Sequence, residues 1–356
     1  MMPPALYIHI PFCSSRCHYC NFYFETGWNE RILRNTLDRS LEEFQQYYRE
    51  LGYPGISTVY LGGGTPSVIP PEMMGDYLSR LFRLIRRDNS FPRVMELDVE
   101  ANPESLSRDF LERIAAESRE HCSTLRLSLG VQSFQPRILR SLGRLSSTDD
   151  IHTALKTAIE FKSDAPLPFA LNCDLIYGAG EQSLEDFQED LQELLYYEPD
   201  GISLYELTVE ERTPLAQAVA AGRKTVADAP RLDSLWALAQ ETLGEHGYRN
   251  YEISNFSRPG KESKHNFAYW RLRPYIGIGP GAVSTLPFGS RPVRIENPDL
   301  FEYRRLDFGQ NLLHPGPGCP GPAPGNPHGM CPGKPPKMLM LMGRCPGIFP
   351  ADQCRN

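Results

Sequence analysis

The 356-residue sequence lacks any hydrophobic run approaching the roughly 20 apolar residues that cross a bilayer. It also lacks a basic N-terminal region, since the chain begins MMPPALYIHIPF, and so shows no secretion signal. Its nine cysteines are an odd number, which argues against a disulfide framework and for a reducing compartment. These absences predict a cytoplasmic protein, or its equivalent in an organelle, without a transmembrane segment.

An excess of positive charge is missing as well. Lys and Arg number 37 against 44 Asp and Glu, and the net charge is -7. A broad nucleic-acid-binding face needs clustered basic residues, so we expect no nucleic-acid partner. The length fits one large barrel with an extension.

Three cysteines stand close together near the N-terminus. Cys13, Cys17 and Cys20 form a C-x3-C-x2-C spacing with no obvious local fourth cysteine. Three thiolates on a 4Fe-4S cluster leave one iron open, and an open metal position is a reaction site. The alternative is a loop with three free or zinc-bound cysteines, but zinc sites usually carry paired Cys or Cys/His sets and no second set follows.

Short strand-like segments alternate with helix-like stretches over the first 208 residues. We expect strands at 6–10, 57–61, 94–99, 125–129, 169–176 and 202–207. We expect helices at 29–51, 71–87, 136–142, 149–161 and 184–197, and a further helix after the third strand that ends near residue 118. Six strand-then-helix units imply a parallel sheet. We therefore predict an α/β fold, a partial (βα)6 TIM-like barrel, with its site at the C-terminal strand ends.

The pattern changes after the sixth strand. Residues 230–244 predict a helix and 248–254 a strand, which suggests a C-terminal α+β extension. The last 46 residues carry eleven Pro, eight Gly and four Cys, too little apolar surface to offset the entropy of ordering, so we expect a disordered tail. The expected division is a barrel at 1–225, an extension at 226–310 and a tail at 311–356.

Several separated stretches resemble one family. They are YIHIPFCSSRCHYC, LGGGTPS, VEANPE, LRLSLGVQSF, NCDLIYG, YEISNFSRPG and HNFAYW. Together they are similar to the oxygen-independent coproporphyrinogen III oxidase-like family of radical-SAM proteins, in which the open iron binds S-adenosylmethionine. The similarity runs from about Tyr7 to Phe308.

The resemblance implies which residues serve the cofactors. Cys13, Cys17 and Cys20 would hold the 4Fe-4S cluster. The S-adenosylmethionine contacts would be Tyr7, Tyr19, Gly63, Gly64, Thr65, Glu100, Gln132, Arg144 and Asp174. Among these, Glu100 and Asp174 are acceptors for ribose hydroxyls or the amine, and Arg144 can pair with the methionine carboxylate. Taken singly, each could instead serve a turn, a cap or packing.

Two departures decide between the branches of this family. The oxidase branch, whose members are also called coproporphyrinogen dehydrogenases, carries a further cysteine two positions after the third, where this chain has Phe22. That branch also has a long N-terminal extension, whereas only six residues precede Tyr7 here. Both departures are typical of the haem chaperone (HemW-type) branch, so an enzymatic activity is uncertain. The alternative function is oxygen-independent coproporphyrinogen III oxidation.

The chaperone branch implies partners. Haem would be the cargo and a haem-requiring apoprotein its recipient; contact with a membrane surface and a homodimer are both compatible with the sequence. His265 is the candidate haem contact, because a neutral imidazole is the usual axial ligand of haem iron. The alternative is a histidine hydrogen-bonded within the C-terminal region.

Overall fold

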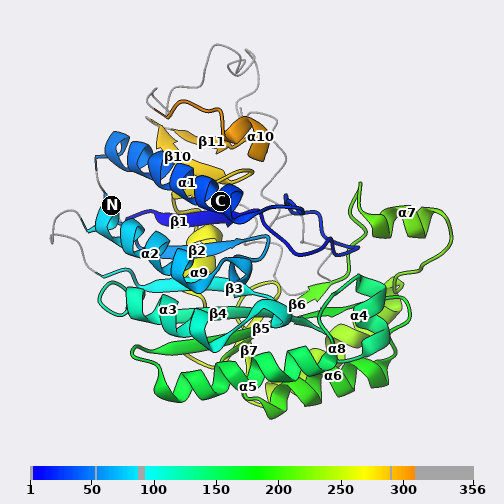
Figure 1. Ribbon diagram of the computed structural model, residues 1–356. Coiled ribbons are helices and arrows are strands. Elements are labelled where there is room, and N and C mark those ends of the chain that lie inside the picture. The colour runs from blue at the N-terminus through cyan, green and yellow to red at the C-terminus, as the bar shows by residue number, and fades with distance from the viewer. Residues whose placement is uncertain (1–2, 53, 87–92, 289–290, 309–356) are drawn as a thin grey trace.

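The computed structural model describes residues 3–52, 54–86, 93–288 and 291–308 (Figure 1). The tail expected at 311–356, with its four cysteines, lies outside the described residues. Within the described ranges, the helices are all too short or too polar to span a membrane.

The centre of the fold is a parallel sheet that confirms the predicted (βα)6 arrangement. Its strands are β1 (Ala5–Ile10), β2 (Thr58–Gly63), β3 (Glu96–Ala101), β4 (Leu125–Gln132), β5 (Phe169–Tyr177) and β6 (Gly201–Glu206), adjacent in sequence order. Each pairs in parallel with the next. All six predicted strands are therefore present, with bounds shifted by a few residues.

The C-terminal region extends both edges of this sheet. At one edge β9 (Tyr275–Ile278) pairs in parallel with β1, followed by antiparallel β10 (Val283–Phe288) and β11 (Arg291–Glu296). At the other edge β8 (Asn255–Ser257) runs antiparallel to β6, and β7 (Arg249–Asn250) pairs with β8. Residues before and after 225 thus share one sheet.

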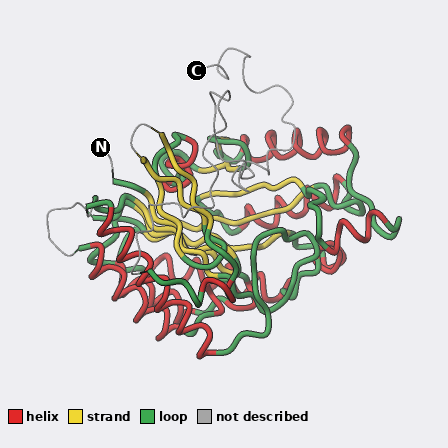
Figure 2. Tube along the Cα trace, turned by 90° about the horizontal axis from the view of Figure 1, so that it is seen from above, coloured by secondary structure: helices red, strands yellow, loops and turns green. Residues whose placement is uncertain are grey.

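Helices connect and cover the strands (Figure 2). They are α1 (Glu30–Glu50), α2 (Pro71–Ile85), α3 (Arg108–Ser118), α4 (Pro136–Leu142), α5 (Thr148–Asp164), α6 (Leu184–Tyr196), α7 (Pro214–Ala220), α8 (Ala229–Glu245), α9 (Lys264–Trp270) and α10 (Leu300–Tyr303), with short 3-10 turns η1 (Pro66–Val68) and η2 (Pro103–Ser105). Side-chain caps begin several of them, and Ser147 and Ser183 each form a capping box.

The predicted strand at 248–254 is confirmed only at residues 249 and 250, which form β7, and is wrong after them. Residues 252–254 form a bend, and the next strand, β8, begins at Asn255. The Glu252 carboxylate causes the break, because it accepts hydrogen bonds from the Ser254 backbone N–H (3.3 Å) and from the Asn255 side-chain amide. These donors curl the chain back instead of leaving it extended.

The two faces of the sheet differ in polarity because side chains alternate along a strand. On β3, Leu97 and Val99 are fully buried against the helices, in the main hydrophobic core. Their neighbours Glu96, Asp98 and Glu100 point to the opposite face. That inner face of the partial barrel is therefore lined with polar groups.

A buried ion network closes the inner face near the N-terminal strand ends. Arg126, which is 4% exposed, donates to Glu96 (3.1 Å) and lies 3.7 Å from Asp98. The other Glu96 oxygen accepts from the Ser263 hydroxyl (3.2 Å) and the Lys264 backbone N–H (2.8 Å) at the start of α9. The network thus anchors α9 to β3.

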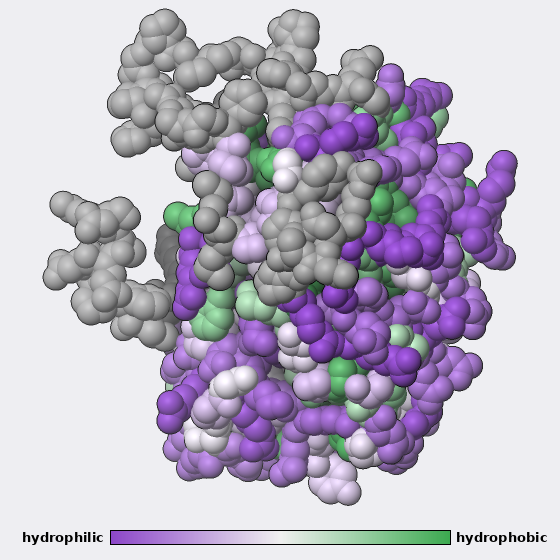
Figure 3. Space-filling view, turned by 90° about the vertical axis from the view of Figure 1, so that its left-hand side faces the viewer, coloured by the Kyte–Doolittle hydropathy of each residue, from purple (hydrophilic) through white to green (hydrophobic). Residues whose placement is uncertain are grey.

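The end of the molecule at which β1 begins is mainly hydrophilic. Figure 3 views this end and shows hydrophobic residues scattered among hydrophilic ones on the described surface. The groups suited to chemistry lie instead at the opposite ends of the strands, as the sequence predicts.

Candidate functional site

The three cysteines lie in the loop that follows β1. The loop is fixed by backbone hydrogen bonds: the Cys13 N–H donates to the Glu25 carbonyl (3.1 Å), and the Cys20 N–H donates to the Cys17 carbonyl (3.3 Å). Trp28 Nε1 donates to the Cys13 carbonyl at 3.0 Å. None of the cysteines in the described part of the chain forms a disulfide.

The start of α7 and the segment before it contact the same loop on the side away from the glycine-rich turn after β2 (Figure 1). The Leu215 N–H donates to the His18 carbonyl (2.9 Å), and Asn21 Nδ2 donates to Glu210 (2.7 Å). Leu215 also joins a small apolar cluster against which Tyr19 packs. The cysteine loop is therefore clamped between the sheet and α7.

The glycine-rich turn after β2 packs directly against this loop. A Cβ on Gly63 would lie 2.4 Å from the His9 ring, and Gly63 has a φ of +109°. A Cβ on Gly64 would lie 2.7 Å from the Ile10 and Phe12 carbonyl oxygens. The positive φ at Gly63 and the close approach of two backbone segments at Gly64 thus favour glycine at both positions.

The N–H groups of this turn are already engaged. Gly63 donates to Glu100 (3.0 Å), Gly64 to the Ile10 carbonyl (2.7 Å) and Thr65 to the Phe12 carbonyl (2.8 Å). The methionine amine of S-adenosylmethionine is a hydrogen-bond donor, so this turn could bind it only through carbonyl oxygens. The N–H groups of the turn serve to position the cysteine loop and Glu100.

Glu100 lies half-buried beneath that turn. Its two oxygens accept from the Tyr60 hydroxyl (2.7 Å) and the Gly63 N–H (3.0 Å). Burial raises the pKa of Glu100, although both hydrogen bonds favour the ionised form. Burial raises the pKa of Tyr7, which is also predicted to contact the cofactor, and the charge of the nearby Glu100 raises it further. The Tyr7 hydroxyl donates to His9 Nδ1 (2.9 Å).

Asp174 lies near the C-terminal end of β5 and within electrostatic reach of Glu100 and Arg144. Its carboxylate accepts from Asn172 Nδ2 at 3.0 Å. Burial raises the pKa of Asp174 to about 7. The group therefore changes charge in the physiological range.

Tyr19 and Arg144 connect Asp174 with the cysteines. Burial raises the pKa of Tyr19, and the nearby Cys17 and Asp174 raise it further, whereas the Arg144 charge lowers it. One Arg144 nitrogen lies 3.7 Å from Cys17 Sγ. The structure thus brings Tyr19, Arg144, Asp174 and the cysteine loop into one site.

Two buried polar atoms at this site have no hydrogen-bond partner. They are Gln132 Oε1 and Arg144 Nε. Gln132 has a φ of +69° at a bulge in β4, a conformation that a non-glycine residue rarely adopts without cause. Unpaired buried polar groups cost free energy unless a ligand pairs them, so the site fits a polar cofactor.

The cysteine loop also fits an iron-sulfur cluster. Burial raises the pKa of Cys13 to about 12, so the bare thiol would keep its proton at neutral pH, and metal binding would displace it. In the described residues, no three His, Cys, Asp or Glu side chains meet closely enough to hold a single metal ion. In a 4Fe-4S cluster, by contrast, each thiolate binds a different iron.

One participating residue was not predicted from the sequence. Asn102, in the VEANPE stretch after β3, accepts from Arg144 (2.9 Å) and donates to Thr65 (3.1 Å). A polar residue directly after a barrel strand is the signal that could have identified it.

His265 has the arrangement of a core histidine. It is 0% exposed, its Nδ1 lies 2.8 Å from the Thr58 hydroxyl, and its Nε2 lies 3.1 Å from the Tyr269 hydroxyl. This is the alternative considered from the sequence, a histidine hydrogen-bonded within the C-terminal region. Haem ligation by His265 would require one of these bonds to break.

Replacing His265 with glutamine is expected to change how stability depends on pH. Burial lowers the pKa of His265 to about 3, below the usual value near 6.5, so the unfolded chain binds the extra proton. Stability from this group is therefore complete above about pH 6.5 and falls as the pH drops, by about 2 kcal/mol at pH 5. Urea unfolding at pH 5 and pH 7 should show a smaller difference in His265→Gln than in the wild type. His246→Gln, at the exposed C-cap of α8, is the control and should keep the wild-type difference.

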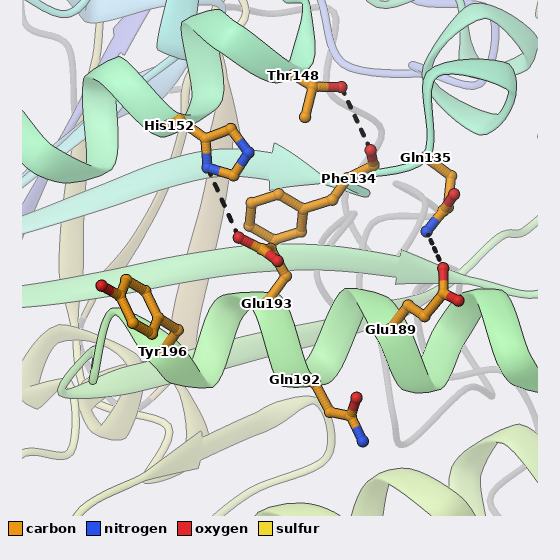
Figure 4. Close-up of a pocket in the computed structure, with 8 residues that line it drawn as sticks. All are labelled: Phe134, Gln135, Thr148, His152, Glu189, Gln192, Glu193 and Tyr196. Atoms are coloured by element: carbon orange, nitrogen blue, oxygen red, sulfur yellow. Dashed lines mark hydrogen bonds and ion pairs between the residues drawn. The ribbon is translucent and has the colours of Figure 1, made fainter.

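A surface cavity lies away from this site. Figure 4 shows it between α5 and α6, with His152 directed toward Glu193 at 3.9 Å and Gln135 bonded to Glu189 at 3.0 Å. Its volume is about 660 Å³, and it is lined by Phe134, Gln135, Thr148, His152, Glu189, Gln192, Glu193 and Tyr196. The cavity contains none of the predicted site residues.

Comparisons with known proteins agree with this geometry. The Radical SAM superfamily model matches residues 7–194. A mouse protein, "Radical S-adenosyl methionine domain-containing protein 1, mitochondrial", is 36% identical over 280 residues, which cover 78% of this chain and 60% of the mouse protein. "Heme chaperone HemW" of Bacillus subtilis is 30% identical over 293 residues, 82% of this chain and 73% of the relative.

A solved structure shows the same fold. The coproporphyrinogen III oxidase HemN of Escherichia coli, described as a radical SAM enzyme, superposes with a TM-score of 0.63 at 24% identity, covering 80% of this chain and 64% of that one. The chain therefore belongs to the radical SAM superfamily, and membership implies a 4Fe-4S cluster and S-adenosylmethionine as its cofactors.

Proposed function

We propose that this protein is a haem chaperone, which binds a 4Fe-4S cluster and S-adenosylmethionine and delivers haem to haem-requiring apoproteins. The observation that carries the proposal is the similarity to several bacterial proteins named heme chaperone HemW, at 30% to 34% identity over about four fifths of the chain. The similarity to the oxidase structure, at 24% identity, supports the fold alone.

The residue after Asn21 also supports this choice. Phe22 occupies the position at which the oxidase branch is expected to carry a further cysteine, and its side chain is 46% exposed. An exposed aromatic ring beside the cysteine loop offers apolar contact area, which a planar hydrophobic cargo requires.

The chain's own residues would arrange the cofactors. Cys13, Cys17 and Cys20 would each bind one iron, and the bound cluster would supply an open iron for the amine and carboxylate of S-adenosylmethionine. Tyr19 offers a face suited to an adenine ring, and the unpaired Nε of Arg144 is a donor for a carboxylate. Asp174 and Glu100 would accept from hydroxyl or amine groups.

Haem titration separates this function from the oxidase alternative. The protein is reconstituted anaerobically with iron and sulfide, then titrated with haem or incubated with coproporphyrinogen III and S-adenosylmethionine. Stoichiometric haem binding without decarboxylated product, followed by transfer to an apo-haem protein, is expected. Formation of the decarboxylated product would favour the oxidase, and absence of haem binding would refute the chaperone.

Binding of S-adenosylmethionine is expected to strengthen as the pH rises through about 7. Desolvation raises the pKa of Asp174 to about 7, and protonation turns one of its two acceptor oxygens into a donor and removes its negative charge. Calorimetric titration of the reconstituted protein at pH 6 and pH 8 measures the change. Asp174→Asn should bind more weakly and with a flat pH profile; the same pH dependence in this variant would assign it to another group. Asp149→Asn, at an exposed position in the first turn of α5, is the matched control.

A further inference from the structure

A chain of side-chain hydrogen bonds joins two of the cysteines from outside their loop. The Thr65 hydroxyl donates to Cys13 Sγ at 3.6 Å, and Arg144 donates to Cys17 Sγ at 3.7 Å. Asn102 stands between the two donors: its Nδ2 donates to the Thr65 oxygen (3.1 Å), and its Oδ1 accepts from Arg144 (2.9 Å). Residues after three different strands therefore converge on two thiols.

The direction of every bond in this chain is fixed by one residue. A guanidinium only donates, so the oxygen of the Asn102 amide must face Arg144 and its NH2 group must face Thr65. The Thr65 oxygen then accepts from Asn102, which leaves its own hydrogen for Cys13. Turning the amide over would set two donors against each other at Arg144.

Asn102 is itself held rigidly. Its backbone N–H donates to the Ser67 hydroxyl (3.2 Å), and its carbonyl accepts from the Ser105 N–H (3.1 Å). Arg144 makes a second bond to the Gly130 carbonyl at 2.9 Å. The donors are therefore in place before any cofactor binds, and their orientation costs nothing at that step.

We propose that Asn102 is a positioning residue for the iron-sulfur cluster: by orienting Thr65 and Arg144 toward the Cys13 and Cys17 sulfurs, it raises the reduction potential of the cluster. Hydrogen bonds to the ligand sulfurs and a nearby cation favour the more negative, reduced cluster. The inference concerns the cluster alone and goes beyond haem delivery, so it holds whether or not the chain carries haem.

An EPR-monitored redox titration of the anaerobically reconstituted protein, without haem, tests the proposal. Asn102→Leu, of nearly the same shape, and Thr65→Val should each shift the midpoint potential to a more negative value than in the wild type. The shift caused by Thr65→Val should shrink in the Asn102→Leu background, because Asn102 acts partly through Thr65. A measured potential is the readout, since a purely structural role would change cluster content or stability instead.

Two control variants should keep the wild-type potential. Thr65→Ser retains the hydroxyl, and Ser163→Ala removes an exposed hydroxyl on α5 that bonds the Glu160 carbonyl. Wild-type potentials in both Asn102→Leu and Thr65→Val would overturn the proposal, as would a full Thr65→Val shift in the Asn102→Leu background. If Asn102→Leu does not fold, Asn102→Ala replaces it, because it also removes both amide partners without adding a charge; the same outcomes then decide.

Discussion

Replacement of Cys17 by serine is expected to reduce bound iron from about four atoms per chain to a trace, because a 4Fe-4S cluster needs a thiolate on each protein-bound iron. Only Cys13 and Cys20 would remain in the loop, and a serine hydroxyl does not ionise at neutral pH. Iron and sulfide analysis, together with visible absorbance after anaerobic reconstitution, measures the loss. Binding of S-adenosylmethionine should be lost with the cluster.

Cys122→Ala is the matched control for this experiment. Cys122 is 1% exposed beside the start of β4, far along the chain from the loop, and burial raises its pKa to about 12. It has the properties of a small hydrophobic side chain, so its loss should leave the iron content unchanged. A Cys17→Ser protein that holds as much iron and sulfide as Cys122→Ala would remove the basis for a cluster in this loop.

Replacement of Arg126 by leucine is expected to lower the free energy of unfolding by about 3–5 kcal/mol, the range for breaking a buried ion pair by removing one partner. Glu96 and Asp98 are 1% exposed each and would stay buried without their cation. Urea unfolding at pH 7 measures the change. Because Glu96 also accepts from the first turn of α9, the variant should expose that helix to early hydrogen exchange.

Two further variants show whether the cause is the unpaired charge. Adding Glu96→Gln and Asp98→Asn to Arg126→Leu removes both carboxylates and should restore part of the loss. Arg108→Leu breaks exposed ion pairs to Glu112 and Asp164, and solvent screening should leave stability nearly unchanged. Equal losses for Arg126→Leu and Arg108→Leu would show that the buried network contributes little.

The sequence predicts the architecture well where the signal is local. Alternation of apolar residues, followed by a turn and a helical period, is present within each strand-helix unit, and all six parallel strands are found. The pairing of β9 with β1 could not be predicted in the same way. Its sequence, YIGI followed by GPG, is typical of a glycine-rich loop, and only the distant β1 makes it a strand.

In the candidate site, too, local features could be predicted from the sequence and contacts between distant segments could not. The cysteine spacing predicts the ligand set, because all three thiols belong to one loop. The partners of a side chain are not contained in its own stretch, however: sequence alone does not pair Asn102 with Arg144, nor His265 with Thr58. Both pairs depend on segments that the fold brings together but that are distant in the chain: Asn102 follows β3 and Arg144 follows α4, while His265 lies on α9 and Thr58 on β2.

The place of β1 in the sheet has a consequence for biosynthesis. The cysteine loop follows the C-terminal end of β1 directly. Ala5 of β1 pairs with Tyr275 of β9, so β1 lacks this neighbouring strand until residue 275 has left the ribosome. Until then β1 presents an open edge on which another extended segment could dock. Assembly of the metal centre is therefore expected only after β9 has been synthesised, and a nascent chain stalled before residue 275 should remain colourless and prone to aggregate.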